Sequence, residues 1–179
     1  IFYRTIMFHL DKKYSEFVNS IKYKDKHFFN LVYLEISTYC NRKCSYCPNK
    51  YYDTPKEFMS WELIKHIVNE LKSINYSGAI SYCLYNEPLF DNRLKDIVEY
   101  INKNLPNSIQ LLVSNGDKLT IDKSKELLNA GINKFIITVH DQNPSNNLNR
   151  LKPIKMFLKE KMILKTSDEL YIQNRGGLI

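Results

Sequence analysis

The sequence predicts an α/β fold built around a parallel β-sheet. Short apolar runs of strand length alternate with longer segments whose apolar residues recur at helical spacing, and this alternation occurs four times. Parallel strands are joined by helical crossovers and are buried on both faces, so they read as nearly continuous apolar runs. Polar residues directly follow several of these runs, where parallel α/β folds place functional side chains.

The first part of the chain is expected to form a helix and then the first strand. Residues 1–27 are assigned to an N-terminal helical extension, and residues 31–36 form an apolar run that only Glu35 interrupts, near its end. The chain starts at Ile1 rather than Met and stops soon after two glycines, so we expect a piece of a longer protein. The apolar residues of the extension that keep helical spacing are Leu10, Tyr14, Phe17, Val18 and Ile21.

The middle of the chain supplies two helices and two further strands. Ser60 is expected to cap a helix with the apolar stripe Ile64, Ile67, Val68 and Leu71, and Gly78 precedes a strand over residues 79–84. A helix opening at Asp91 is expected to precede a third strand over residues 109–113. Its apolar face consists of Leu94, Ile97, Val98 and Ile101.

The last part of the chain repeats the pattern less clearly. Asp122 is expected to cap a short helix that ends at Gly131, and a fourth strand follows over residues 135–139. The remaining expectations are a polar loop over residues 143–149, a helical piece over 154–161 and a fifth strand over 169–173.

Three cysteines, Cys40, Cys44 and Cys47, lie within eight residues just after the first expected strand. Thiolates are the soft ligands that select iron–sulfur clusters, zinc or cuprous copper. A four-iron cluster usually takes four thiolates, so three local cysteines leave one iron open to a small molecule. Zinc bound by this triplet and Cys83 is the alternative, although zinc sites usually pair two knuckles. A lysine-rich chain with no visible signal peptide argues against disulfides and indicates the reducing cytoplasm.

The C-x3-C-x2-C spacing after a strand is similar to the signature of the radical S-adenosylmethionine (radical SAM) superfamily. The resemblance implies a partial (β/α)6 barrel with parallel strands over residues 28–170, which we expect to be truncated at both ends. It also implies a [4Fe–4S] cluster held by Cys40, Cys44 and Cys47, with SAM on the open iron and Tyr46 near its adenine. An electron from the cluster would cleave SAM to a 5′-deoxyadenosyl radical that abstracts hydrogen from the substrate.

Segments after the later strands also resemble family motifs. Asn86-Glu87-Pro88 resembles the Gly-Gly-Glu-Pro motif, with Asn86 in place of a glycine, which implies that Glu87 holds the SAM amino group. Ser114-Asn115-Gly116 and Thr138 occupy positions where relatives place cofactor contacts. From the residues alone, the first segment also fits a plain Asn-Glu-Pro turn and the second an Asn-Gly turn.

Catalytic residues are not identified by these motifs, and two weak candidates remain. His140 follows the fourth strand and is a candidate substrate contact or an ordinary surface hydrogen-bonding group. Cys83 resembles the hydrogen-donating cysteine of radical SAM epimerases, or is a small buried apolar residue in the second strand. Residues 171–179 include Asn174-Arg175-Gly176-Gly177, which resembles the segment before a SPASM or shortened (twitch) extension; Arg175 is otherwise a turn residue.

Taken with the composition, the resemblance implies a cytoplasmic radical SAM oxidoreductase that acts on a peptide or a small natural product. Its expected partner is an external electron donor such as flavodoxin or ferredoxin. The chain has 179 residues, a formal charge of +7 and no apolar run approaching the roughly 20 residues of a membrane span. The basic charge leaves RNA modification as an alternative, and a non-catalytic iron–sulfur or zinc module is the other.

Overall fold

A computed structural model describes residues 29–51 and 55–169 of the chain. Its centre is a five-stranded sheet in which every strand runs parallel to its neighbours and the order follows the sequence, β1-β2-β3-β4-β5. This confirms the α/β class with a parallel sheet, open in the manner of a partial barrel. The strands are β1 (Leu31–Tyr33), β2 (Ala79–Ser81), β3 (Ile109–Ser114), β4 (Lys134–Val139) and β5 (Met162–Thr166). The helices are α2 (Trp61–Ser73), α3 (Leu94–Asn104), α4 (Ile121–Ala130) and α5 (Ser145–Leu158).

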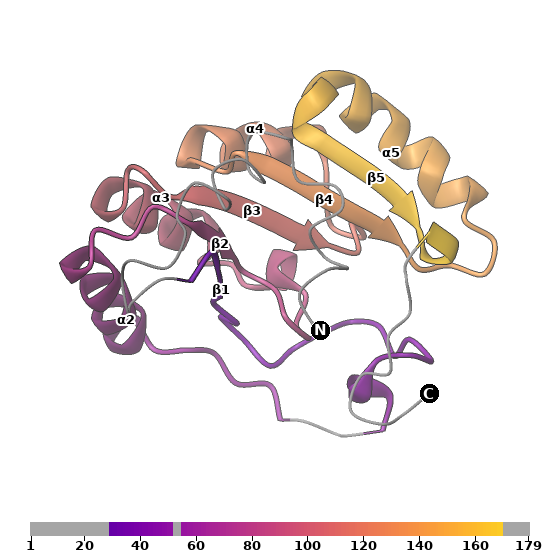
Figure 1. Cartoon of the computed structure of the whole chain (residues 1–179). Helices are drawn as coiled ribbons and strands as arrows, with labels where there is room; N and C mark the ends of the chain where they lie inside the picture. The colour runs from indigo at the N-terminus through magenta and orange to yellow at the C-terminus, as the bar shows by residue number, and fades with distance from the viewer. Residues whose placement is uncertain (1–28, 52–54, 170–179) are drawn as a thin grey trace. The chain divides into compact units, whose positions relative to one another are not determined.

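The helices form one layer against the sheet. Successive helices contact one another from α2 to α5, and the arrowheads of the strands point toward the side on which residues 40–50 lie (Figure 1). Each helix buries an apolar stripe; in α3 all four predicted residues, Leu94, Ile97, Val98 and Ile101, have no exposed surface. Burial of such a stripe removes apolar area from water and stabilises the layer.

Helix ends confirm two predicted caps and correct two others. The Ser60 side chain accepts the N–H of Leu63, and Gly131 ends α4 with a φ of 127°, a conformation that favours glycine. Thr120, not Asp122, caps α4 through its side chain. Asp91 accepts the N–H of Arg93 ahead of α3, which begins only at Leu94.

The first two strands are shorter than predicted. β1 ends at Tyr33 and β2 at Ser81, although Leu34 still donates a backbone hydrogen bond to Ser81. Beyond these points Leu34, Ile36 and Tyr82 stay buried, while the backbone leaves the ladder to build loops and Leu84 is exposed. An apolar run in the sequence does not distinguish a strand from the buried start of a loop, so the predicted strands were too long.

The last part of the chain differs from the prediction in two places. The polar residues 143–149 mostly begin helix α5 rather than a loop, and the strand Met162–Thr166 was not predicted. The predicted strand over residues 169–173 falls outside the described residues except for Glu169, which belongs to a short 3₁₀ helix. Leu151, Ile154 and Leu158 are buried and anchor α5, so tertiary packing outweighs the weak helix propensity of the asparagines. The lysines around β5 made its short apolar run difficult to recognise as a strand from the sequence.

Some expectations lie outside the described residues. These are the helical extension over residues 1–27 and the segment Asn174-Arg175-Gly176-Gly177, so the proposed domain boundaries stay predictions. Among residues 29–51 and 55–169, no helix is both long enough and apolar enough to cross a membrane.

Candidate functional site

The cysteine loop, residues 40–47, leaves the sheet after β1 and leads into the short 3₁₀ helix Pro48–Lys50. Its end is fixed by a turn in which the N–H of Cys47 donates to the carbonyl of Cys44 at 3.0 Å. Burial raises the pKa of the Cys40 thiol, and the charges of Glu87, Cys44 and Cys47 raise it further. Burial also raises the pKa of Cys44.

The three thiols therefore lie half-buried on one loop, as free cysteines that influence one another. Within the described part of the chain, no three Cys, His, Asp or Glu side chains are already arranged around a common point as metal ligands. The donor set still fits an iron–sulfur cluster, because three thiols on one short loop can turn toward it by side-chain rotation. Ligation by Cys40, Cys44 and Cys47 remains a proposal.

Glu35 organises the loop after β2. Its Oε1 accepts the N–H groups of Tyr85 and Asn86 at 2.8 and 3.0 Å, so the carboxylate fixes the turn that leads into Glu87. The Asn86 side chain accepts from the N–H of Leu84 and donates to the carbonyl of Tyr82, at 3.2 and 3.1 Å. The Asn86 side chain is thus buried within its own turn. The sequence signal that could have identified Glu35 was its position as the only charged residue in the first apolar run.

Glu87 is 2% exposed and connects three segments. Its backbone N–H donates to Tyr39 beside the cysteine loop at 2.7 Å. Its carboxylate accepts the Ser114 hydroxyl and the Asn115 N–H, each at 2.7 Å. Burial raises the pKa of Glu87 to about 7, while the hydrogen bonds from Asn115 and Ser114 act in the opposite direction. This acid is therefore poised to change charge near neutral pH.

Glu87 and Ser114, predicted separately as cofactor contacts, are brought into direct contact with each other. Thr138 lies inside β4, one residue before the strand ends, and is 7% exposed. Cys83 does not lie in β2 as predicted but follows it, half-buried, with its thiol 3.0 Å from the carbonyl oxygen of Asn86. The loop that Glu35 and Asn86 hold explains this, because it begins earlier than the apolar run suggests.

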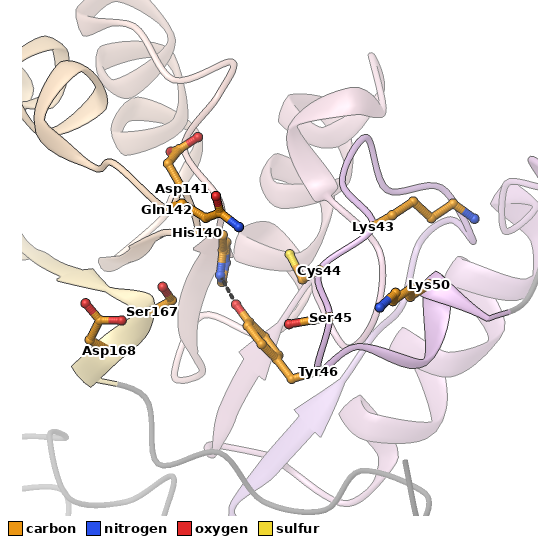
Figure 2. A pocket seen from close by; sticks show the side chains of 10 residues that line it. All are labelled: Lys43, Cys44, Ser45, Tyr46, Lys50, His140, Asp141, Gln142, Ser167 and Asp168. Atoms are coloured by element: carbon orange, nitrogen blue, oxygen red, sulfur yellow. Dashed lines mark hydrogen bonds between the residues drawn. The ribbon is translucent and has the colours of Figure 1, made fainter. Parts of the chain in front are cut away.

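A cavity of about 400 Å³ opens beside the cysteine loop, toward the ends of β4 and β5 (Figure 2). The Tyr46 hydroxyl forms a hydrogen bond with Nδ1 of His140 across it, so these two residues share one site. Cys83 is not among the lining residues. The lining residues are Lys43, Cys44, Ser45, Tyr46, Lys50, His140, Asp141, Gln142, Ser167 and Asp168.

Sequence reasoning missed the charged residues that hold the cysteine loop. Arg42 forms salt bridges with Asp117, which follows β3, and with Asp141, which follows β4. Both aspartates lie just after a strand, where functional side chains were expected, but the spacing gave no sign of their common partner.

Comparisons with known proteins identify the family of the chain. The sequence profile described as "Radical SAM superfamily" matches residues 34–170. The S-adenosyl-L-methionine-dependent 2-deoxy-scyllo-inosamine dehydrogenase of Niallia circulans is 31% identical over 154 residues, which cover 84% of this chain and 61% of that protein. The chain therefore spans about three fifths of the length of this relative.

Two solved structures resemble the fold. The crystal structure of BtrN in complex with AdoMet and 2-DOIA is 30% identical with a TM-score of 0.79, covering 84% of this chain and 62% of that one. BtrN in an open conformation is 29% identical with a TM-score of 0.66, covering 80% and 58%. None of these matches bears on the SPASM-like ending, which stays a prediction. With the profile spanning most of its length, the chain belongs to the radical SAM superfamily.

Proposed function

We propose that this chain is the core of a SAM-dependent dehydrogenase that oxidises a small hydroxylated amine. The observation that carries the proposal is the 31% identity, over most of this chain, with a dehydrogenase named for an inosamine substrate. The similarity to the crystal structure of BtrN in complex with AdoMet and 2-DOIA, with a TM-score of 0.79, supports it.

The residues proposed to hold the cofactors are those that the sequence singled out. Cys40, Cys44 and Cys47 would bind a [4Fe–4S] cluster, and the Glu87 carboxylate would attract the SAM amino group. When bound, the cluster and SAM supply the one-electron chemistry that removes a hydrogen atom from a carbon. The chain holds Glu87 in place through Ser114 and Asn115, so this carboxylate is oriented in advance.

The cavity supports a small substrate rather than a peptide. A volume of about 400 Å³ lies within the range of small-molecule sites. Lys43 on the cysteine loop and Lys50 in the 3₁₀ helix that follows it line one side of the cavity, while Asp168 lies on the β5 side (Figure 2). Charges of both signs suit a polar molecule with hydroxyl and amino groups. Tyr46 would pack against the adenine, and its hydroxyl positions the His140 ring.

The decisive experiment uses anaerobically reconstituted, reduced protein. We expect an electron paramagnetic resonance signal that shifts when SAM is added, and 5′-deoxyadenosine in the chromatogram. Formation of 5′-deoxyadenosine should rise with an amino-polyol such as 2-deoxy-scyllo-inosamine and not with a tyrosine-containing peptide. Zinc in place of iron, or a cluster indifferent to SAM, would contradict the proposal and favour a metal-stabilised binding module.

Two further assignments accompany the proposal. An external flavodoxin or ferredoxin would supply the electron in a reducing cytoplasm, consistent with cysteines that form no disulfide within the described residues. The net charge of +7 motivates a check for RNA, whose binding should fall steeply with added salt. We expect no specific RNA binding, since the described cavity is sized for a small molecule.

A further inference from the structure

Arg42 lies between the first two cysteines of the loop and joins it to two strands. Its Nε and Nη2 donate to the two carboxylate oxygens of Asp117 at 2.7 and 2.6 Å. Its Nη1 and Nη2 also reach Asp141 at 3.2 Å. Because Asp117 follows β3 and Asp141 follows β4, one guanidinium links the cysteine loop to the ends of both strands.

The geometry and burial distinguish this cluster from an ordinary surface ion pair. Two parallel hydrogen bonds to one carboxylate are the strong arrangement for arginine. The side chains of Arg42, Asp117 and Asp141 are only 18%, 22% and 29% exposed. Burial alone would raise the pKa of Asp117, yet hydrogen bonds from Arg42 and Asn41 outweigh it and hold that pKa below its ordinary value.

Asn41, the neighbour of Arg42, extends the same network toward Glu87. Its Nδ2 donates to Asp117 at 2.7 Å, and its Oδ1 accepts from the side chain of Asn115 at 2.8 Å. The backbone N–H of Asn115 donates to the Glu87 carboxylate at 2.7 Å. The cysteine loop and the proposed SAM-binding acid are therefore fixed to one shared support.

We propose that Arg42 is a positioning residue that holds the cysteine loop in register for cluster binding. The inference deepens the proposed function and rests on it, since the cluster is what the loop would hold.

We infer also that Arg42, Asp117 and Asp141, which together carry one net negative charge, tune the reduction potential of a cluster beside them. Arg42 lies two residues from both Cys40 and Cys44 along the loop, and its ion pairs bring the two aspartates to the same loop.

Loop positioning is tested first on protein without cluster. Arg42→Gln removes the charge, and Arg42→Lys keeps it but cannot make the paired hydrogen bonds. Alkylation of the loop thiols should be faster in both variants, and more so in Arg42→Gln. Lys95→Gln is the matched control, because it breaks an exposed Lys95–Glu99 pair of 2.8 Å on α3. Circular dichroism verifies that each variant is folded.

Cluster retention is tested next by challenging reconstituted protein with an iron chelator. Loss of a residue that supports metal ligands typically weakens metal affinity about 10- to 100-fold. We expect a loss in that range for Arg42→Gln, a smaller loss for Arg42→Lys and none for Lys95→Gln. Should Arg42→Gln fail to fold, Asp117→Asn, which preserves side-chain shape, provides the same test.

The reduction potential separates the electrostatic role from a merely structural one. Asp141 contacts Arg42 only at 3.2 Å, so we expect Asp141→Asn protein to keep its cluster. Because the substitution removes one negative charge, the reduction potential of the cluster should rise. Glu99→Gln removes the same charge far away in the exposed pair on α3 and should leave the potential unchanged.

Two results would overturn the inference. One is Arg42→Gln protein with wild-type thiol reactivity and wild-type chelator resistance. The other is an unchanged potential in Asp141→Asn, which would remove the electrostatic part. Wild-type protein that takes up no iron would instead contradict the proposed function, while the alkylation rates would still decide whether Arg42 orders the loop.

Discussion

Replacing Glu87 by Gln should change how the stability of the cluster-free protein depends on pH. Burial raises the pKa of this acid from an ordinary value of 4.5 to about 7, against the hydrogen bonds of Asn115 and Ser114, with the charge of Asp117 adding to the rise. The folded protein therefore holds the proton more tightly than the unfolded chain. Stabilisation from that proton is full below pH 4.5 and is lost as the pH rises through 7.

The magnitude follows from the difference in pKa. At about 1.4 kcal/mol per pKa unit, the whole effect is about 3 kcal/mol, and about 2 to 3 kcal/mol of it falls between pH 5 and pH 8. Gln cannot ionise, so its contribution stays constant across this range. The free energy of unfolding of the wild type, relative to that of Glu87→Gln, should therefore fall by this amount as the pH rises.

Urea unfolding at pH 5, 6, 7 and 8, followed by fluorescence of the single tryptophan, Trp61, measures this difference. A chelator and a reducing agent keep the protein free of metal and disulfides. Glu160→Gln, at an exposed position after α5, controls for removing an acid at the surface. A difference that stays constant with pH, or that grows as the pH rises, would refute the reasoning.

Three more results are expected. Cys44→Ala should abolish iron binding whereas Cys83→Ala should retain it, as measured by iron content after reconstitution, because only Cys44 lies on the cysteine loop. Gly116→Ala should destabilise the fold by about 1 to 3 kcal/mol in urea unfolding, since φ is 74° and the added Cβ would come within 2.6 Å of a β4 side chain. Tyr46→Phe should weaken SAM binding several-fold in a calorimetric titration, because it loses a hydrogen bond to His140 worth about 1 kcal/mol while keeping the ring.

Much of the fold was predictable because its signals are local. Apolar runs separated by helical stripes gave the class and four of the five strands. Ser60 and Gly131 marked helix ends through side-chain and backbone preferences that act over a few residues. The fifth strand was missed, since Ile163 and Leu164 lie among lysines and only pairing with β4 makes them a strand.

The candidate site was predictable as a set of residues but not as an arrangement. The cysteine spacing and the position of Glu87 after a strand are sequence features, so both could be chosen in advance. The hydrogen bond between Ser114 and Glu87 joins residues 27 apart, and the contacts of Arg42 with Asp117 and Asp141 span 75 and 99 positions. Side-chain partners at such separations follow from how the loops fold over one another, which no short pattern encodes.

The order of the sheet also bears on how the chain folds. Every strand pairs with the next one along the sequence, so folding can proceed by adding one β-α-β unit at a time. The connection from β1 to β2 is the longest of the four and contains the cysteine loop. Closing a longer loop costs more chain entropy, so we expect β1 to dock last on a nucleus formed by β3, β4 and their helices. The cysteines would then stay accessible to cluster delivery until the final step of folding encloses them.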